Sequence, residues 1–129
     1  MTALFILAMI GAASLPAQGA AVAVPSGMAV SFHEMLWDDP GQGPVYRLRF
    51  VAPQIAADPA PGYDSLGADM DALCEAIAIP ATADLSPRPA RIVISLMAAP
   101  TLFGQASPDT RQVFEAYSLR DGLCIWEAF

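Results

Sequence analysis

Two segments in the first half of the chain alternate between apolar and polar side chains, as half-buried β-strands do. They cover residues 28–37 and 45–52, and a segment rich in proline and glycine, residues 38–44, separates them. The apolar side chains predicted to share one face of the first strand are Val30, Phe32 and Leu36. We therefore expect a hairpin, preceded by a flexible entry over residues 20–27.

A loop rich in proline and alanine follows at residues 53–62, and the apolar period then changes to that of a helix. The side chains that form one helical stripe are Leu66, Met70, Leu73 and Ile77. Asp64 or Ser65 is suited to cap the helix, and Pro80 is expected to end it. Cys74 lies beside the stripe.

Three more strands are predicted in the second half of the chain. Residues 90–97 are β-branched and almost wholly apolar, which is typical of a central strand covered on both faces. Residues 113–119 and 123–129 flank an Asp-Gly pair at 121–122, a hairpin pattern. The order β-β-α-β-β-β predicts an α+β, two-layer sandwich in which one helix packs on a mainly antiparallel sheet.

The beginning of the chain has the composition of an export signal. Residues 4–15 form an apolar run, Pro16 ends it, and small residues follow. We predict cleavage near residues 19–23, so that residues 1–21 form a signal peptide and 22–129 a single α+β domain that is periplasmic or secreted. An uncleaved membrane anchor and a buried helix are the alternatives.

The chain has two cysteines, Cys74 and Cys124. In a small exported domain an even number of cysteines predicts a disulfide, because that compartment is oxidising. The bond would close a loop of roughly 50 residues, link the helix to the last strand and stabilise the fold by about 4 kcal/mol. Two buried thiols are the alternative. The sequence contains no CxxC motif that would favour a redox or metal pair.

The charge of the chain limits the classes of partner that we expect it to bind. The formal net charge of the 129 residues is -7, and all six cationic side chains are arginines scattered along the sequence. A nucleic acid or an anionic membrane attracts concentrated positive charge, so we expect neither as a partner once the leader is removed. No cofactor-binding or metal-ligand motif is present, and one histidine cannot supply a histidine-rich metal site.

Arginines and glutamates on the predicted sheet form the strongest candidate site. Arg47 and Arg49 share one face of the second strand, Glu34 lies on the first, and Glu115 and Glu127 lie on the last two. Cross-strand ion pairs are the simpler interpretation. A groove that binds a carboxylate or a protein partner is the more specific one.

Two weaker candidates are His33 and a group of carboxylates at the helix. His33 has acidic neighbours and could act as a base, but residues 33 and 34 of a strand point to opposite faces. The carboxylates are Asp64, Asp69, Asp71 and Glu75. Their spacing does not match a calcium-binding EF-hand loop, so a solvated helix face is favoured.

Several segments together resemble an uncharacterised family of small exported alphaproteobacterial proteins. They are residues 45–53 (VYRLRFVAP), 69–74 (DMDALC), 91–96 (RIVISL), 103–104 (FG), 114–117 (FEAY) and 122–129 (GLCIWEAF). The resemblance implies membership of that family but no activity. Some relatives carry the label acetolactate synthase, which we reject for this chain because it lacks the Gly-Asp-Gly signature of a thiamine diphosphate site.

The sequence favours a non-enzymatic exported module that binds an unknown protein partner in the cell envelope or serves there as an accessory factor. The alternative is a small periplasmic ligand-binding domain or enzyme that uses the Arg47/Arg49 face or His33. No cofactor is expected in the first case.

Overall fold

The computed structural model describes residues 15–128, so most of the predicted leader lies outside the described residues. The strands are β1 (Ala21–Val22), β2 (Val30–Asp38), β3 (Val45–Val51), β4 (Arg91–Met97), β5 (Gln112–Arg120) and β6 (Leu123–Glu127). The helical segments are η1 (Pro53–Ala56), α1 (Tyr63–Leu73), η2 (Cys74–Ala78) and α2 (Ile79–Thr82). Within residues 15–128 none of the helices has the length and apolar character needed to cross a membrane.

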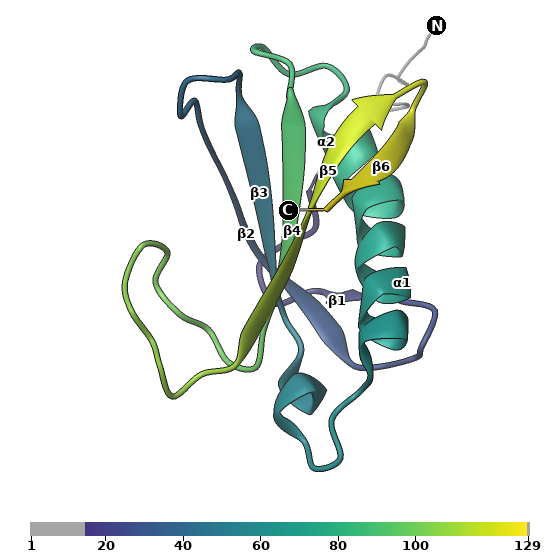
Figure 1. Ribbon diagram of the computed structural model, residues 1–129, viewed down its shortest axis with the longest axis vertical. Helices are drawn as coiled ribbons and strands as arrows, with labels where there is room; N and C mark the ends of the chain where they lie inside the picture. Colours follow the sequence, from purple (N-terminus) through teal and green to yellow (C-terminus); the bar gives the residue numbers. More distant parts are fainter. Residues whose placement is uncertain (1–14, 129) are drawn as a thin grey trace, which may run out of the picture.

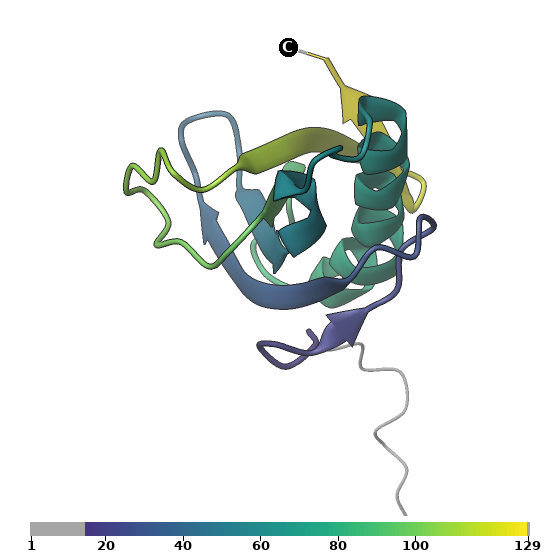
Figure 2. The ribbon, with the colours of Figure 1, turned by 90° about the horizontal axis from the view of Figure 1, so that it is seen from below.

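The six strands form one sheet in the order β1-β2-β3-β4-β5-β6. β3 and β4 run parallel, because the helical connection carries the chain from one end of the sheet to the other, and the remaining four neighbouring pairs are antiparallel. The sheet is curled, and the long helix lies along its concave side (Figures 1 and 2). The α+β class is as predicted, with one more strand than expected.

The additional strand, β1, lies where the sequence predicted a flexible entry. Ala21 and Val22 pair with the start of β2, and the Gly19 amide donates a hydrogen bond of 2.7 Å to the Phe32 carbonyl. Val22 and Val24 pack against the hydrophobic core, which accounts for the ordered backbone. The predicted cleavage window, residues 19–23, therefore coincides with a strand.

A β-bulge changes which side chains of β2 face the core. The register against β3 shifts between Phe32 and Glu34, which leaves His33 as an extra residue. Because side chains alternate, one extra residue reverses the faces of all positions after it. Leu36, predicted to share a face with Phe32, therefore lies on the opposite face and pairs with Arg47. The hairpin was predicted, but this face assignment was wrong.

The helical segments run continuously from Tyr63 to Thr82 and bury the predicted stripe. Its side chains Leu66, Met70 and Leu73 are buried, and Ile77 is partly buried against the same core. The sheet side of that core consists mainly of Tyr46, Leu48, Phe50, Ile92, Ile94, Leu96 and Tyr117. The N-cap is Gly62 with no side-chain capping bond, so the prediction of Asp64 or Ser65 was wrong.

Pro80 does not end the helix, contrary to the prediction from sequence. η2 is a π-helical segment in which the Ile79 amide donates to the Cys74 carbonyl, five residues back. Pro80 then occupies the first turn of α2, where its missing amide hydrogen costs little. The wider turn also has room for a ring that would clash with a carbonyl in a regular α-helix.

The predicted disulfide is confirmed. Cys74, at the start of η2, is fully buried and bonded to Cys124 in β6, with the two Cα atoms 6.3 Å apart. β6 is the outermost strand on its side of the sheet. The bond therefore fixes an edge strand to the helical layer.

Candidate functional site

The helix covers one face of the sheet and leaves the other face open. Side chains that alternate with the core residues point to this second side, which we call the open face. They include Arg47 and Arg49 from β3, Val93 and Ser95 from β4, and Phe114 and Ala116 from β5. In Figure 2 the connection between β4 and β5, residues 98–111, extends on the side opposite the helix.

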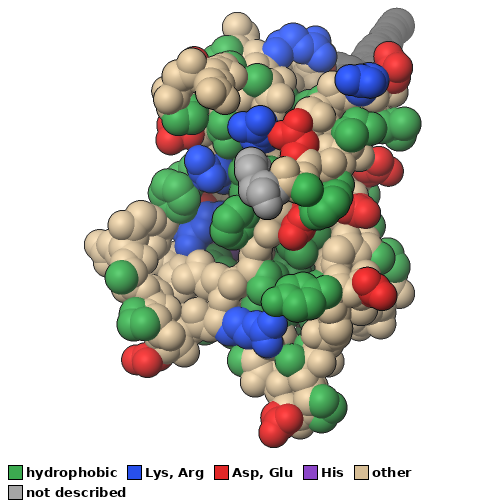
Figure 3. All heavy atoms as spheres, in the orientation of Figure 1, with side chains coloured by type: hydrophobic (Ala, Val, Ile, Leu, Met, Phe, Trp, Pro, Cys, Tyr) green, Lys and Arg blue, Asp and Glu red, His purple; other side chains and the backbone are tan. Residues whose placement is uncertain are grey.

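A groove of about 240 Å³ lies between this connection and the open face. Arg47, Arg49, Val93 and Phe114 line it from the sheet, and Phe103 lines it from the connection. Figure 3 shows cationic side chains in a hollow beside the protruding connection. The structure thus brings the two predicted arginines together with the exposed aromatic residues Phe103 and Phe114.

Arg49 is fully engaged with its own protein. It is only 3% exposed, and its guanidinium donates to the Glu34 carboxylate at 2.5 Å and to the Thr101 hydroxyl at 2.6 Å. Its Nη2 atom also lies 3.3 Å from the Met97 sulfur. Such a set of bonds compensates for the burial of the charge. Arg49 therefore holds the 98–111 connection against the sheet and is not available to a ligand.

Arg47 lies on the same face but is engaged much less. Its side chain is 28% exposed, and its Nε atom is the one buried side-chain polar atom of residues 15–128 without a hydrogen-bond partner. The nearby Asp38 carboxylate, itself 58% exposed, is 3.9 Å from that atom, which is beyond hydrogen-bond distance. The guanidinium lies 5.6 Å from the ring centre of Phe103. Arg47, which lines the groove, thus retains an unsatisfied donor.

Of the three predicted glutamates, only Glu34 joins the arginines, in the cross-strand ion pair with Arg49. Glu127 lies on the open face, but it accepts a 2.9 Å hydrogen bond from Arg91 Nε. Glu115 lies on the helix side of β5, where it accepts a hydrogen bond from the Trp126 indole. His33 occupies the bulge of β2 and does not line the groove.

Three of the four carboxylates predicted on the helix have separate structural partners, and the fourth, Asp64, is exposed. Asp69 is buried and accepts hydrogen bonds from the amide and the hydroxyl of Ser26, at 2.9 and 2.5 Å. Asp71 accepts a 2.8 Å hydrogen bond from the Tyr117 hydroxyl, and Glu75 accepts one of 3.2 Å from the Cys124 amide. Across residues 15–128, no three His, Cys, Asp or Glu side chains gather as a metal ion would require.

Among the described titratable groups, Tyr117 is the one whose pKa clearly departs from its ordinary value. Burial raises the pKa of its phenol, and the hydrogen bond and negative charge of Asp71 raise it further. Glu115 and Glu75 add to the same effect. The phenol therefore stays neutral and acts as a fixed donor between β5 and α1.

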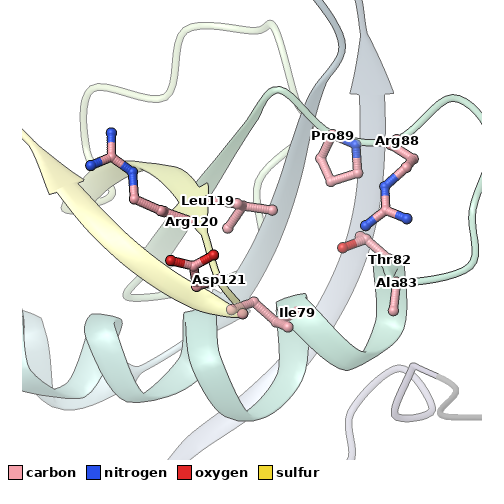
Figure 4. A pocket seen from close by; sticks show the side chains of 9 residues that line it. Ile79, Thr82, Ala83, Arg88, Pro89, Leu119, Arg120 and Asp121 are labelled. Atoms are coloured by element: carbon pink, nitrogen blue, oxygen red, sulfur yellow. The ribbon is translucent and has the colours of Figure 1, made fainter.

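Another cavity, of about 420 Å³, lies at the end of the sheet near α2. Arg88, Arg120 and Asp121 are among its lining residues (Figure 4). In this view the Arg88 side chain points toward Thr82, whereas that of Arg120 points away from it. The two cations do not converge on a common point, so this cavity lacks the arrangement of an anion site.

Comparison with known proteins assigns the chain to a family. A sequence model described as a family of unknown function, DUF6497, matches residues 7–129. No curated protein and no solved structure matched the chain. Since the match spans nearly the whole sequence, the chain belongs to the DUF6497 family.

Proposed function

We propose that the mature chain is an exported, non-enzymatic binding module whose partner is a protein of the cell envelope. The groove between the 98–111 connection and the open face is its docking surface. The observation that carries this proposal is the clustering of exposed apolar side chains around a cationic floor. Three of them line the groove: Leu102, Phe103 and Phe114, which are 68%, 52% and 62% exposed.

The composition of the groove supports a protein partner. Aromatic residues and arginine are enriched where protein interfaces gain most of their binding energy, and clustered exposed apolar side chains are typical of such surfaces. Pockets for small molecules usually enclose roughly 300–1,000 Å³ and surround most of the ligand. This groove, at about 240 Å³, is smaller. A protein segment lying along it is the better fit.

Position-specific crosslinking in the periplasm tests the proposal. A photoreactive phenylalanine analogue is placed at Phe103 or Phe114, and at Tyr63 as a control. Tyr63 is 82% exposed and lies at the start of α1, where it does not line the groove. We expect one shared protein adduct from positions 103 and 114 and none from 63. Failure to form that adduct, or an equal yield from all three positions, would contradict the proposal.

Export itself is tested by the intact mass of the protein purified from the periplasm. We expect the first 19–23 residues to be absent and the mass to be about 2 Da below that of the reduced chain. Cleavage after Gly19 keeps β1, whereas cleavage after Ala23 removes it. A retained leader or two titratable thiols in the native protein would exclude this processing.

A further inference from the structure

The difference between Arg47 and Arg49 points to the chemistry of the partner. We infer that the groove binds an acidic segment of a protein, with an Asp or Glu carboxylate at Arg47 and a neighbouring apolar side chain against Phe103 and Phe114. This inference rests on the proposed function, because it concerns the same groove.

Of the two arginines, only Arg47 has a charge that is available to a partner. Arg49 and Glu34 neutralise each other in a nearly buried ion pair, and Thr101 takes a further guanidinium donor. Arg47 has only the loose pair with Asp38, in which more than half of the carboxylate surface is exposed to solvent. Exposed pairs of this kind contribute little free energy. Arg47 can therefore exchange Asp38 for a better acceptor at small cost.

The guanidinium of Arg47 is suited to a carboxylate acceptor. Arg47 Nε is buried and lacks a hydrogen-bond partner, although burial of an unsatisfied donor is unfavourable. A carboxylate can accept from two guanidinium nitrogens at once, the pairing for which the planar guanidinium is best suited, and the Arg47 side chain is 28% exposed. Phe103 lies against the guanidinium and limits its movement, so less freedom is lost on binding.

Apolar side chains surround the Arg47 cation. Phe103 and Phe114 expose apolar surface beside Arg47, and Val93 of β4 lies between the strands that carry Arg47 and Phe114. An acidic residue with an apolar neighbour satisfies both features, whereas a purely apolar segment would leave the Arg47 guanidinium with only its loose pair to Asp38. The groove is a local cationic site on a protein of net charge -7. It is therefore complementary to an acidic segment through this contact.

A random peptide library displayed on phage is the probe. The library is selected on the mature, disulfide-bonded protein, and affinities of enriched peptides are measured by fluorescence anisotropy. We expect peptides in which Asp or Glu stands next to an aliphatic or aromatic residue. R47Q should weaken their binding by about tenfold or more, since a hydrogen-bonded charge pair is lost. The control R120Q makes the same change of charge at the far end of β5 and should bind as the wild type does.

Asp38→Asn provides a test in which a gain of affinity is expected, a result that misfolding would not produce. Because Asp38 competes for Arg47, its neutralisation should tighten the binding of the acidic peptides by about two- to fivefold. Replacing Glu by Gln in the peptide should abolish the difference between wild type and R47Q. Circular dichroism and thermal melting establish that each variant is folded.

The possible outcomes separate this inference from the proposed function. Peptides without acidic residues that bind wild type and R47Q equally, but lose binding in F103A, would overturn the acidic partner and leave the docking groove intact. The same conclusion follows if no acidic peptide is selected while the crosslinked adduct forms. If neither peptides nor an adduct is found, the docking groove itself is refuted.

Discussion

The two faces of the sheet are built from the same strands but have different surroundings. On the helix side, Leu48 and Ile94 are fully buried beneath α1 and η2. On the open face, Val45, Val93 and Ala116 form a small separate cluster, while Phe114 remains largely exposed. Successive side chains of a strand point to opposite faces, and both faces of this sheet carry apolar residues. The helical layer covers only one of these faces. The open face therefore retains exposed apolar side chains and an arginine donor without a hydrogen-bond partner.

The same contrast occurs on a smaller scale between Arg47 and Arg49. The two side chains leave one strand on one face, two residues apart, and both lie 5.6 Å from the Phe103 ring centre. Only Arg49 is reached by Glu34 and Thr101. A neighbouring connection thus decides which of two similar arginines is structural and which is free to bind.

Removing the link between the helical layer and β6 is expected to have the largest effect on stability. The double variant Cys74→Ala/Cys124→Ala opens a loop that spans a sequence separation of 50. On the chain-entropy argument, the free energy of unfolding should fall by about 4 kcal/mol. Urea denaturation measures the change. Reduction of the wild-type protein should give a similar loss, and equal stability of the oxidised and reduced forms would contradict the prediction.

A matched pair of leucine truncations compares the two faces directly. Leu48→Ala creates a cavity under the helix and should lower the free energy of unfolding by about 3 kcal/mol. Leu102→Ala removes the same atoms from a side chain that is 68% exposed at the groove. Its effect should stay within about 0.5 kcal/mol. Similar losses from both truncations would show that the groove is part of the core.

The two arginines provide the next comparison. Arg49→Gln leaves Glu34 without its buried partner and loosens Thr101, which should cost about 2 kcal/mol, reduced from the fully buried case because Glu34 is 32% exposed. Arg47→Gln should change stability by less than about 0.5 kcal/mol. Urea denaturation of both variants tests this order. A larger loss from Arg47→Gln would assign Arg47 a structural role.

Much of the fold could be predicted from the sequence, because it depends on the local periodicity of apolar residues. The alternation in residues 45–52, the helical stripe from Leu66 to Ile77 and the Asp-Gly turn each predicted the element that is present. The bulge at His33, the π-helical η2 and the two-residue β1 were missed. Each depends on how the chain packs against distant residues, which a local period does not record.

Only part of the candidate site could be predicted from the sequence, for a related reason. Alternation placed Arg47 and Arg49 on one face, but no local pattern shows that Thr101 reaches only Arg49. Glu115 was grouped with the arginines although its position in the β5 register places it on the helix side. Strand pairing and the path of the connection determine these contacts.

The last expected effect concerns Tyr117, which joins the helix-side core to Asp71. Tyr117→Phe removes the 2.8 Å hydrogen bond and should lower the free energy of unfolding by about 1 kcal/mol at neutral pH. Burial and Asp71 raise the pKa of the phenol in the folded protein above its value in the unfolded chain, about 10. The folded state therefore keeps a proton that the unfolded chain loses once the pH exceeds that value.

The sign of the pH dependence follows from this difference. Stabilisation by Tyr117 is complete below pH 10 and decreases above it, by up to about 1.4 kcal/mol per pH unit, as the unfolded chain releases its proton. Tyr117→Phe lacks this contribution, so the stability curves of the two proteins should converge between about pH 10 and 11. The chain has no lysine to titrate in this range. Urea denaturation at several pH values measures the difference, and curves that stay parallel would show that the phenol is not held neutral by the helix-side core.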